Sequence, residues 1–223
     1  METAHESTGN NQRERLNNLY RFQRHFYDLT RAAFLFGRDE MLWEIAAQHS
    51  SGNILEVGCG TGRNLVRLRQ MAPDAKLYGL DASDEMLKTA GAKFDARGLE
   101  KAITLKQGLA EEFGFGKPFD LDEPFDAIFI SYSLSMFPKW REALRNALGN
   151  LKPGGRLYIV DFWDGLGLPN WLMTLRTWWL GLFHVYYRPE FLQFLEKLEL
   201  EGHGKLIVSP VGRHYAFFAR FQK

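Results

Sequence analysis

Apolar and polar positions change their period along the chain. Between residue 13 and about residue 30 the apolar residues recur at helical spacing, and after Gly37 a second helix is predicted over residues 39–48. From residue 53 onward, short apolar runs alternate with helical segments. The apolar runs predict strands over residues 53–58, 76–81, 102–108, 125–131 and 155–162. The helical segments between them cover residues 63–71, 83–98 and 138–151, and a break is expected at Lys152-Pro153-Gly154-Gly155.

The last third of the chain adds further apolar segments. An aromatic stretch over residues 168–187 comes first, followed by a helix over 188–200 and strands over 205–210 and 214–221. Strands that alternate with helices predict a mostly parallel α/β sheet, here of seven strands, with helices on both faces. No repeat or linker divides the chain, so we predict a single domain over residues 13–223 after a disordered tail over residues 1–12.

The composition argues against several classes of function. The formal net charge of +1 disfavours a dedicated nucleic-acid binder, which usually carries a strongly basic face. Cys59 is the single cysteine, so an intrachain disulfide is impossible and a reducing cytoplasm fits best. The polar N-terminus lacks the apolar core of a secretory signal. No cluster of His, Asp and Glu has metal-ligand spacing, so no metal is expected.

A glycine-rich turn follows the first predicted strand. The strand ends in Gly58-Cys59-Gly60-Thr61-Gly62, and a helix begins directly afterwards. Glycines let the backbone turn sharply and approach a ligand closely, and ligands of doubly wound folds lie at this carboxyl edge of the sheet. A plain tight turn is the alternative. The dinucleotide fingerprint needs a third glycine where this chain has Arg63, so the NAD pattern fails.

The pattern Gly-x-Gly-x-Gly, with Glu56 two residues ahead, is similar to the S-adenosylmethionine (SAM) loop of class I methyltransferases. Residues 151–161, LKPGGRLYIVD, resemble the same family before and through the fifth strand. The resemblance covers residues 54–161. It implies a Rossmann-like fold with SAM as cofactor and S-adenosylhomocysteine as product. A carboxylate at Asp81, which closes the second strand, can accept both ribose hydroxyls.

The adenine side departs from the family pattern at Leu109. Members often carry an acid at this position that bonds the adenine amino group, so adenine recognition here must use backbone groups of Leu109 and Ala110. Met86 either packs on the adenine or belongs to the core, and Ser83 suits the N-cap of its helix. The residues expected around SAM are Tyr27, Arg38, Glu56, Gly58, Cys59, Gly60, Asn64, Asp81, Ala82, Met86, Gly108, Leu109, Ala110 and Ser131.

The acceptor is harder to predict, because a fold does not name its substrate. The loop after the fourth strand, SYSLSMFPKW, lacks the Asn-Pro-Pro-Tyr type of motif that methylation of DNA bases or glutamine amides needs. For an amine acceptor the protein mainly orients a neutral nitrogen and excludes water, and aromatic faces help to hold an ammonium. Core or surface packing is the alternative for each candidate ring. The candidates are Tyr20, Tyr27, Tyr132, Trp163, Tyr186 and Tyr187.

A closer resemblance is to the bacterial betaine-lipid methyltransferases, the diacylglyceryl-homoserine N-methyltransferase family. Its more specific pieces are YDLTR…FLFGRD, within residues 27–39, and FHV, at residues 183–185. It implies that the chain trimethylates the amino group of diacylglyceryl-homoserine, with the aminocarboxypropyl transferase that makes this lipid as a partner. It also implies an N-terminal helical lid over residues 13–50, with Tyr27 and Arg38 near the methionine end of SAM.

Other functions stay open beside this one. A phosphatidylethanolamine N-methyltransferase, a methyltransferase for a soluble small amine, and a non-catalytic SAM-binding scaffold are the alternatives. A carboxylate or phosphate on a lipid acceptor would suit arginine and histidine side chains, although solvated surface arginines are equally compatible with the pattern. Tyr132, Tyr27 and Tyr20 are predicted to position the acceptor. The predicted substrate-binding residues are Arg24, Arg31, Trp163, Tyr186, Tyr187, Arg213 and His214.

The aromatic stretch over residues 168–187 holds three of the six tryptophans and no acidic residue. A membrane span is unfavourable, because Arg176 would lie near the bilayer centre. Inserting an arginine there costs about 2.5–3.5 kcal/mol of free energy. The stretch is then either a helix packed on the domain or a helix at an anionic membrane surface. We expect this insertion, residues 164–187, to lie near the acceptor pocket, and the protein to be peripheral at the inner face of the cytoplasmic membrane.

Overall fold

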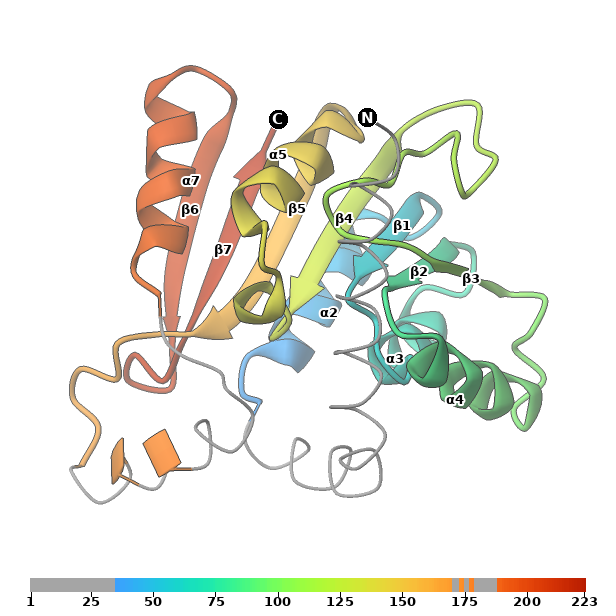
Figure 1. Cartoon of the computed structure of the whole chain (residues 1–223), viewed down its shortest axis with the longest axis horizontal. Helices are drawn as coiled ribbons and strands as arrows, with labels where there is room; N and C mark the ends of the chain where they lie inside the picture. Colours follow the sequence, from blue (N-terminus) through green and yellow to red (C-terminus); the bar gives the residue numbers. More distant parts are fainter. Residues whose placement is uncertain (1–34, 170–172, 175–176, 179–187) are drawn as a thin grey trace, which may run out of the picture.

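The computed structural model describes residues 35–169, 173–174, 177–178 and 188–223. Several predictions therefore lie outside the described residues: the disordered tail, the first helix, and the side chains of Tyr20, Arg24, Tyr27, Arg31, Tyr186 and Tyr187. In the described part, a central sheet is flanked by helices on both faces (Figure 1).

The sheet has seven strands in the order β3-β2-β1-β4-β5-β7-β6. The first five strands pair in parallel, and β7 runs antiparallel to both β5 and β6. This confirms the predicted Rossmann-like α/β sheet. The strands are β1 (Asn53–Val57), β2 (Lys76–Asp81), β3 (Ile103–Gln107), β4 (Phe125–Ser131), β5 (Leu151–Phe162), β6 (Lys205–Val211) and β7 (Ala216–Gln222).

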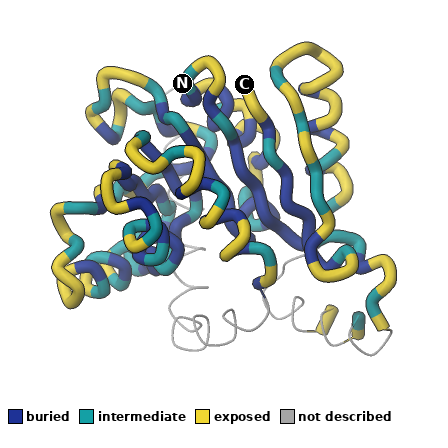
Figure 2. The backbone as a smooth tube through the Cα atoms, turned by 180° about the vertical axis from the view of Figure 1, so that it is seen from behind, coloured by how far each residue is buried: buried dark blue, intermediate teal, exposed yellow. Residues whose placement is uncertain are grey.

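Two hydrophobic clusters cover the two faces of the sheet. One cluster contains apolar residues of α2 (Arg38–Gln48), α3 (Arg63–Met71) and α4 (Asp84–Asp95). The other contains those of α5 (Trp140–Gly149) and α7 (Glu190–Leu200). The central strands are buried on both sides, as expected of parallel strands between two helical layers, and they appear dark blue in Figure 2. Exposed residues line the outer surfaces of the helices.

The strand boundaries differ from the sequence predictions at two places. The predicted break at 152–155 lies inside β5, which begins at Leu151; Gly154 has φ 78°, and the pairing with β4 shifts register between Phe125 and Ala127. The positive φ of Gly154 and the register shift let the chain bend at this point while β5 continues. The last strand begins later than predicted, at Ala216, because residues 212–214 form a turn with positive φ.

Helix α2 is part of the core. Met41, Leu42 and Ile45 are fully buried against the sheet. A polar contact also holds the helix to the sheet, since Arg220 Nε on β7 donates to Glu44 Oε2 over 2.6 Å. Within the predicted lid, residues 38–48 are therefore packed on the sheet, and a lid role for residues 13–34 stays a prediction.

Candidate functional site

The glycine loop joins β1 to α3 with three glycines at positive φ, namely Gly58 (76°), Gly60 (52°) and Gly62 (71°). A Cβ on Gly58 would lie 2.5 Å from Ser133 Oγ, so this position has no space for a side chain. A Cβ on Gly60 would meet nothing within 4 Å. The loop is therefore tightly packed on the protein side and open on its outer side, where a ligand can approach the backbone.

Asp81 ties this loop to the end of β2. Its Oδ2 accepts a hydrogen bond from the N–H of Gly60 over 2.8 Å, and its Oδ1 accepts one from the N–H of Ser83 over 2.9 Å. A carboxylate can accept about four hydrogen bonds, which makes it a group suited to a ribose diol. Ser83 caps α4, with its Oγ accepting from the N–H of Met86 over 3.4 Å, as the sequence predicted.

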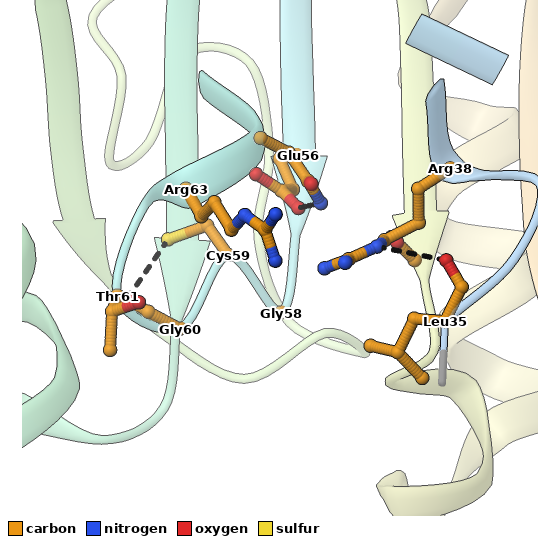
Figure 3. A pocket seen from close by; sticks show the side chains of 10 residues that line it. Leu35, Arg38, Glu56, Gly58, Cys59, Gly60, Thr61 and Arg63 are labelled. Atoms are coloured by element: carbon orange, nitrogen blue, oxygen red, sulfur yellow. Dashed lines mark hydrogen bonds between the residues drawn. The ribbon is translucent and has the colours of Figure 1, made fainter. Parts of the chain in front are cut away.

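A pocket opens between the glycine loop and the segment that leads into α2 (Figure 3). Glu56 is buried there, and its Oε1 accepts from Asn64 Nδ2 over 2.7 Å. The pocket brings together seven of the predicted SAM residues with three others. Its lining residues are Leu35, Arg38, Glu56, Gly58, Cys59, Gly60, Thr61, Arg63, Asn64 and Ser131.

The predicted adenine residues lie beside Asp81, at the ends of β2 and β3. The N–H of Gly108 donates to the carbonyl of Asp81 over 3.1 Å, and Gln107 Nε2 donates to the carbonyl of Ala82 over 3.2 Å. Leu109 and Ala110 are buried, and the carbonyl of Ala110 accepts from Asn146 Nδ2 over 3.2 Å. Met86 is buried as well.

These residues fit SAM. Ser131 Oγ, in the pocket, is buried and has no hydrogen-bond partner among the described residues, and buried hydroxyls are usually bonded. The open side of Gly60 and the carboxylate of Asp81 provide the approach and the acceptor that a nucleoside needs. When bound, SAM would supply an electrophilic methyl group on a sulfonium, and Asp81, Glu56 and the glycine loop are the residues that would hold it.

Cys59 lies in the loop but is unsuited to nucleophilic chemistry. Burial raises the pKa of its thiol well above the usual range, and the nearby carboxylates of Asp81 and Glu56 raise it further. The thiol therefore stays neutral, and the thiolate that attacks electrophiles is not formed. Cys59 acts in the site through its backbone and its small side chain.

Four aromatic rings form a chain next to the pocket. Tyr132 follows the pocket residue Ser131, and Phe36 follows the pocket residue Leu35. Ring centroids are 4.7 Å apart between Tyr132 and Phe162, 5.8 Å between Phe162 and Tyr215, and 5.1 Å between Tyr215 and Phe36. Tyr132 is 1% exposed, and its hydroxyl donates to the carbonyl of Phe36 over 2.6 Å. This geometry does not support the prediction that Tyr132 positions the acceptor; Tyr132 instead supports the segment that leads into α2.

The loop after β5 and the β6–β7 turn meet at the same edge of the sheet. His214 stacks on Trp163 with ring centroids 4.3 Å apart, and its Nδ1 lies 3.3 Å from Asp164 Oδ1. The N–H of Gly165 donates to the carbonyl of His214 over 2.8 Å. Two predicted acceptor residues, Trp163 and His214, are thus brought together, whereas Arg213 is exposed on the turn.

Sequence reasoning missed three features of the site. Arg63 served only to exclude the NAD pattern, yet it lines the pocket. Asp164 pairs with His214, fifty residues later in the chain, and no local pattern connects them. Arg213 and His214 both have positive φ (54° and 62°), which is unusual for residues other than glycine and often marks a functional segment. The dipeptide Gly212-Arg213 before the last strand was the available signal for the turn.

No helix in the described part of the chain is both long and apolar enough to cross a membrane. Within the same ranges, no group of three or more His, Cys, Asp or Glu residues lies in an arrangement that would hold a metal ion.

Comparison with known proteins bears on the family and on the acceptor. Residues 54–155 match the family model described as a methyltransferase domain. A demethylmenaquinone methyltransferase of Thermus thermophilus is 33% identical over 141 residues, which cover 61% of this chain and 60% of that protein. A demethylmenaquinone methyltransferase of Listeria welshimeri is 31% identical over 149 residues, which cover 65% of this chain and 57% of that protein. The chain thus spans about three fifths of the length of the curated relatives it matches.

Solved structures agree on the fold. A SAM-dependent methyltransferase of Aquifex aeolicus is 22% identical with a TM-score of 0.61, covering 86% of this chain and 92% of that one. A SAM-dependent methyltransferase of Thermotoga maritima, described as a possible histamine N-methyltransferase, is 18% identical with a TM-score of 0.64, covering 93% and 99%. At these identities the likeness extends to the fold alone.

The prediction of a betaine-lipid N-methyltransferase is wrong, because these relatives are named as methyltransferases of demethylmenaquinone. The motifs from residue 54 to residue 161 resemble those of SAM-dependent methyltransferases in general and do not distinguish acceptors. The more specific resemblance rested on short segments within residues 27–39 and 183–185, most of which lie outside the described residues. Residues 54–155 thus match a methyltransferase domain, and the whole sheet has the fold of the solved SAM-dependent methyltransferases.

Proposed function

We propose that this chain transfers the methyl group of SAM to a ring carbon of a reduced quinone, with demethylmenaquinone as the first candidate. The observation that carries the proposal is the identity of 33% and 31% to demethylmenaquinone methyltransferases over about 150 residues. The surroundings of the pocket are compatible with such an acceptor. Phe36, next to the pocket residue Leu35, is 51% exposed and offers an aromatic face to a flat, apolar ring.

The chemistry requires the acceptor in its reduced form. Methyl transfer from a sulfonium is a displacement, and the acceptor carbon must donate an electron pair. An oxidised quinone ring is electron-poor, whereas the deprotonated quinol ring is a carbon nucleophile. A carbon–carbon bond forms, the bond between sulfur and the methyl carbon breaks with its electron pair going to sulfur, and the ring releases one proton.

The chain offers a group that can take up this proton. Among the histidines that the structure describes, only His214 follows the carboxyl end of a strand at the edge where the glycine loop lies; His49 follows α2 and His203 follows α7. Asp164 Oδ1 lies 3.3 Å from Nδ1 of His214, which makes no hydrogen bond among the described residues, and Nε2 is the nitrogen that would act as general base. The stacking on Trp163 holds the imidazole plane.

A quinone with an apolar tail would be taken up from a membrane, and the proposal therefore includes a peripheral membrane association. Two exposed apolar side chains after β5 support it, since Leu166 is 67% exposed and Trp178 is 63% exposed. Tryptophan favours the boundary between headgroups and acyl chains.

The direct test uses purified protein, SAM and detergent-dispersed demethylmenaquinone that has been reduced with dithionite. We expect mass spectrometry to show a product heavier by one methylene group, together with S-adenosylhomocysteine. The same mixture with oxidised quinone, and the variant Asp81→Ala with reduced quinone, should both give little product. Full turnover of SAM-bound protein on another acceptor, with none on the quinol, would reject the proposal.

A further inference from the structure

Arg63 is the first residue of α3, and its side chain lines the pocket beside the glycine loop. The guanidinium is turned into the pocket, as Figure 3 shows. In the described part of the chain it forms no hydrogen bond and no ion pair, whereas Arg67 on the same helix pairs with Asp39 and Arg69 donates to the carbonyl of Ala75. A charged group directed inward without a protein partner indicates that the pocket takes an anion.

The charges around the pocket support this conclusion. Arg38 is 9% exposed, and its guanidinium points toward that of Arg63 from the opposite side (Figure 3). Glu56 is the only acidic residue of the lining, so two guanidinium groups and one carboxylate leave a formal charge of +1. Two like charges that face each other in a partly buried pocket repel, and an anion between them removes the repulsion.

A second observation points independently to a ligand. Ser131, on the same pocket, is 8% exposed, and its Oγ has no hydrogen-bond partner among the described residues. The pocket thus combines two guanidinium groups, the hydroxyl of Ser131 and the buried carboxylate of Glu56. The amino-acid end of SAM carries a carboxylate, which matches the guanidinium groups, and an ammonium group, which matches Glu56.

We propose that Arg63 binds the α-carboxylate of the methionine end of SAM from the side opposite to Arg38, and that it makes the site select nucleosides that carry an amino-acid end. The planar guanidinium fork suits a carboxylate and adds geometric specificity. The sheet order supports this placement of the two ends of SAM, because β2 and β4 lie on opposite sides of β1. Asp81 at the end of β2 is on the side expected for the nucleoside, and Ser131 at the end of β4 is on the other side. This inference deepens the proposed function and rests on its cofactor, but not on its acceptor.

The test is calorimetric binding to the protein without any acceptor. The ligands are SAM and decarboxylated SAM, which lacks only the carboxylate. We expect Arg63→Gln to weaken SAM binding by about 10- to 100-fold, the range of a charge-assisted hydrogen bond. Binding of decarboxylated SAM should change by less than about twofold, because the group that Arg63 contacts is already missing. Arg63→Lys should retain part of the SAM affinity.

Arg69→Gln is the matched control, since it removes the same charge from the same helix outside the pocket and should leave both affinities unchanged. Thermal unfolding and circular dichroism of each variant separate misfolding from lost binding, and Arg63→Lys serves if Arg63→Gln does not fold. Equal weakening of both ligands, or of neither, would overturn the proposal, as would wild-type protein that binds both equally. Failure of the quinol assay alone would leave these binding results intact and reject only the proposed acceptor.

Discussion

The carboxylate of Asp81 accepts a hydrogen bond from the backbone N–H of Gly60 over 2.8 Å. This contact joins the end of β2 to the glycine loop that follows β1. It aligns the loop before any ligand binds, and it directs the carboxylate to the edge of the sheet where a nucleoside would lie. Asp81 therefore has a structural role, and its ligand-binding role stays a prediction.

We expect Asp81→Asn to weaken SAM binding by about 1.5–3 kcal/mol, because the charged acceptor for the ribose hydroxyls is lost. The variant keeps a side-chain oxygen that can accept from Gly60, so the free energy of unfolding should fall by less than about 1.5 kcal/mol. Calorimetry with SAM and chemical denaturation measure the two effects. Unchanged SAM affinity would contradict the assignment of Asp81 to the cofactor.

Substitution by alanine should change the stability of the protein differently at two glycines of the loop. Gly58→Ala should destabilise the protein by about 2–4 kcal/mol, since a left-handed backbone is strained with a Cβ and the new atom would lie 2.5 Å from Ser133 Oγ. Gly60→Ala has open space and should lose only about 1–2 kcal/mol, while its Cβ occupies the approach of the ligand and weakens SAM binding. Urea unfolding and calorimetry compare them; equal losses of stability would argue against this packing.

His49 predicts a pH dependence of stability. Burial lowers the pKa of His49 below its usual 6.5, and the charge of Arg156 lowers it further. The folded state therefore binds this proton less readily than the unfolded chain does, so the contribution is fully present above about pH 6.5 and is lost as the pH falls through the lower folded value. Thermal unfolding between pH 5 and pH 8 should show this decrease. In His49→Gln the decrease should be smaller, and an identical pH profile would exclude His49 as its source.

His214→Gln tests the proposed general base. With reduced demethylmenaquinone we expect kcat to fall by about 100-fold or more, the usual range for general acid–base catalysis, with SAM affinity unchanged. Asp164→Asn should produce a smaller loss, because it changes a neighbour of the imidazole and leaves the imidazole itself in place. An unchanged kcat in His214→Gln would reject this role.

Membrane association is tested by vesicle sedimentation with anionic lipid. The double variant Leu166→Ser/Trp178→Ser should remain more in the supernatant than the wild-type protein, since it removes two exposed apolar side chains after β5. Trp43→Ser on α2 is the control, because Trp43 has the same exposed fraction, 63%, at a different place. Equal sedimentation of all three proteins would argue against a membrane surface at Leu166 and Trp178.

Much of this molecule followed from local sequence. The sheet of seven strands, the glycine loop, the place of Asp81 at the end of β2 and the cap at Ser83 were all predicted. Each depends on residues that are close in sequence: an apolar run that enters glycines, an acid that closes a strand, or a serine three residues before a backbone N–H. The period of apolar positions determines such elements because it dictates which face can be buried.

Tertiary structure alone decided how distant residues combine. Asp164 meets His214 because β5 and β7 pair antiparallel, and Arg38 faces Arg63 because α2 packs beside α3; neither pairing leaves a periodic signal. The contact of Tyr132 is set in the same way, by the carbonyl of Phe36, 96 positions earlier, which accepts a hydrogen bond from its hydroxyl. The sequence by itself determined the glycine loop and the position of Asp81, which are predicted to form the cofactor half of the site, since one turn and one strand end build them. The half that meets the acceptor is assembled from separate segments, so its composition depends on the packing that brings them together.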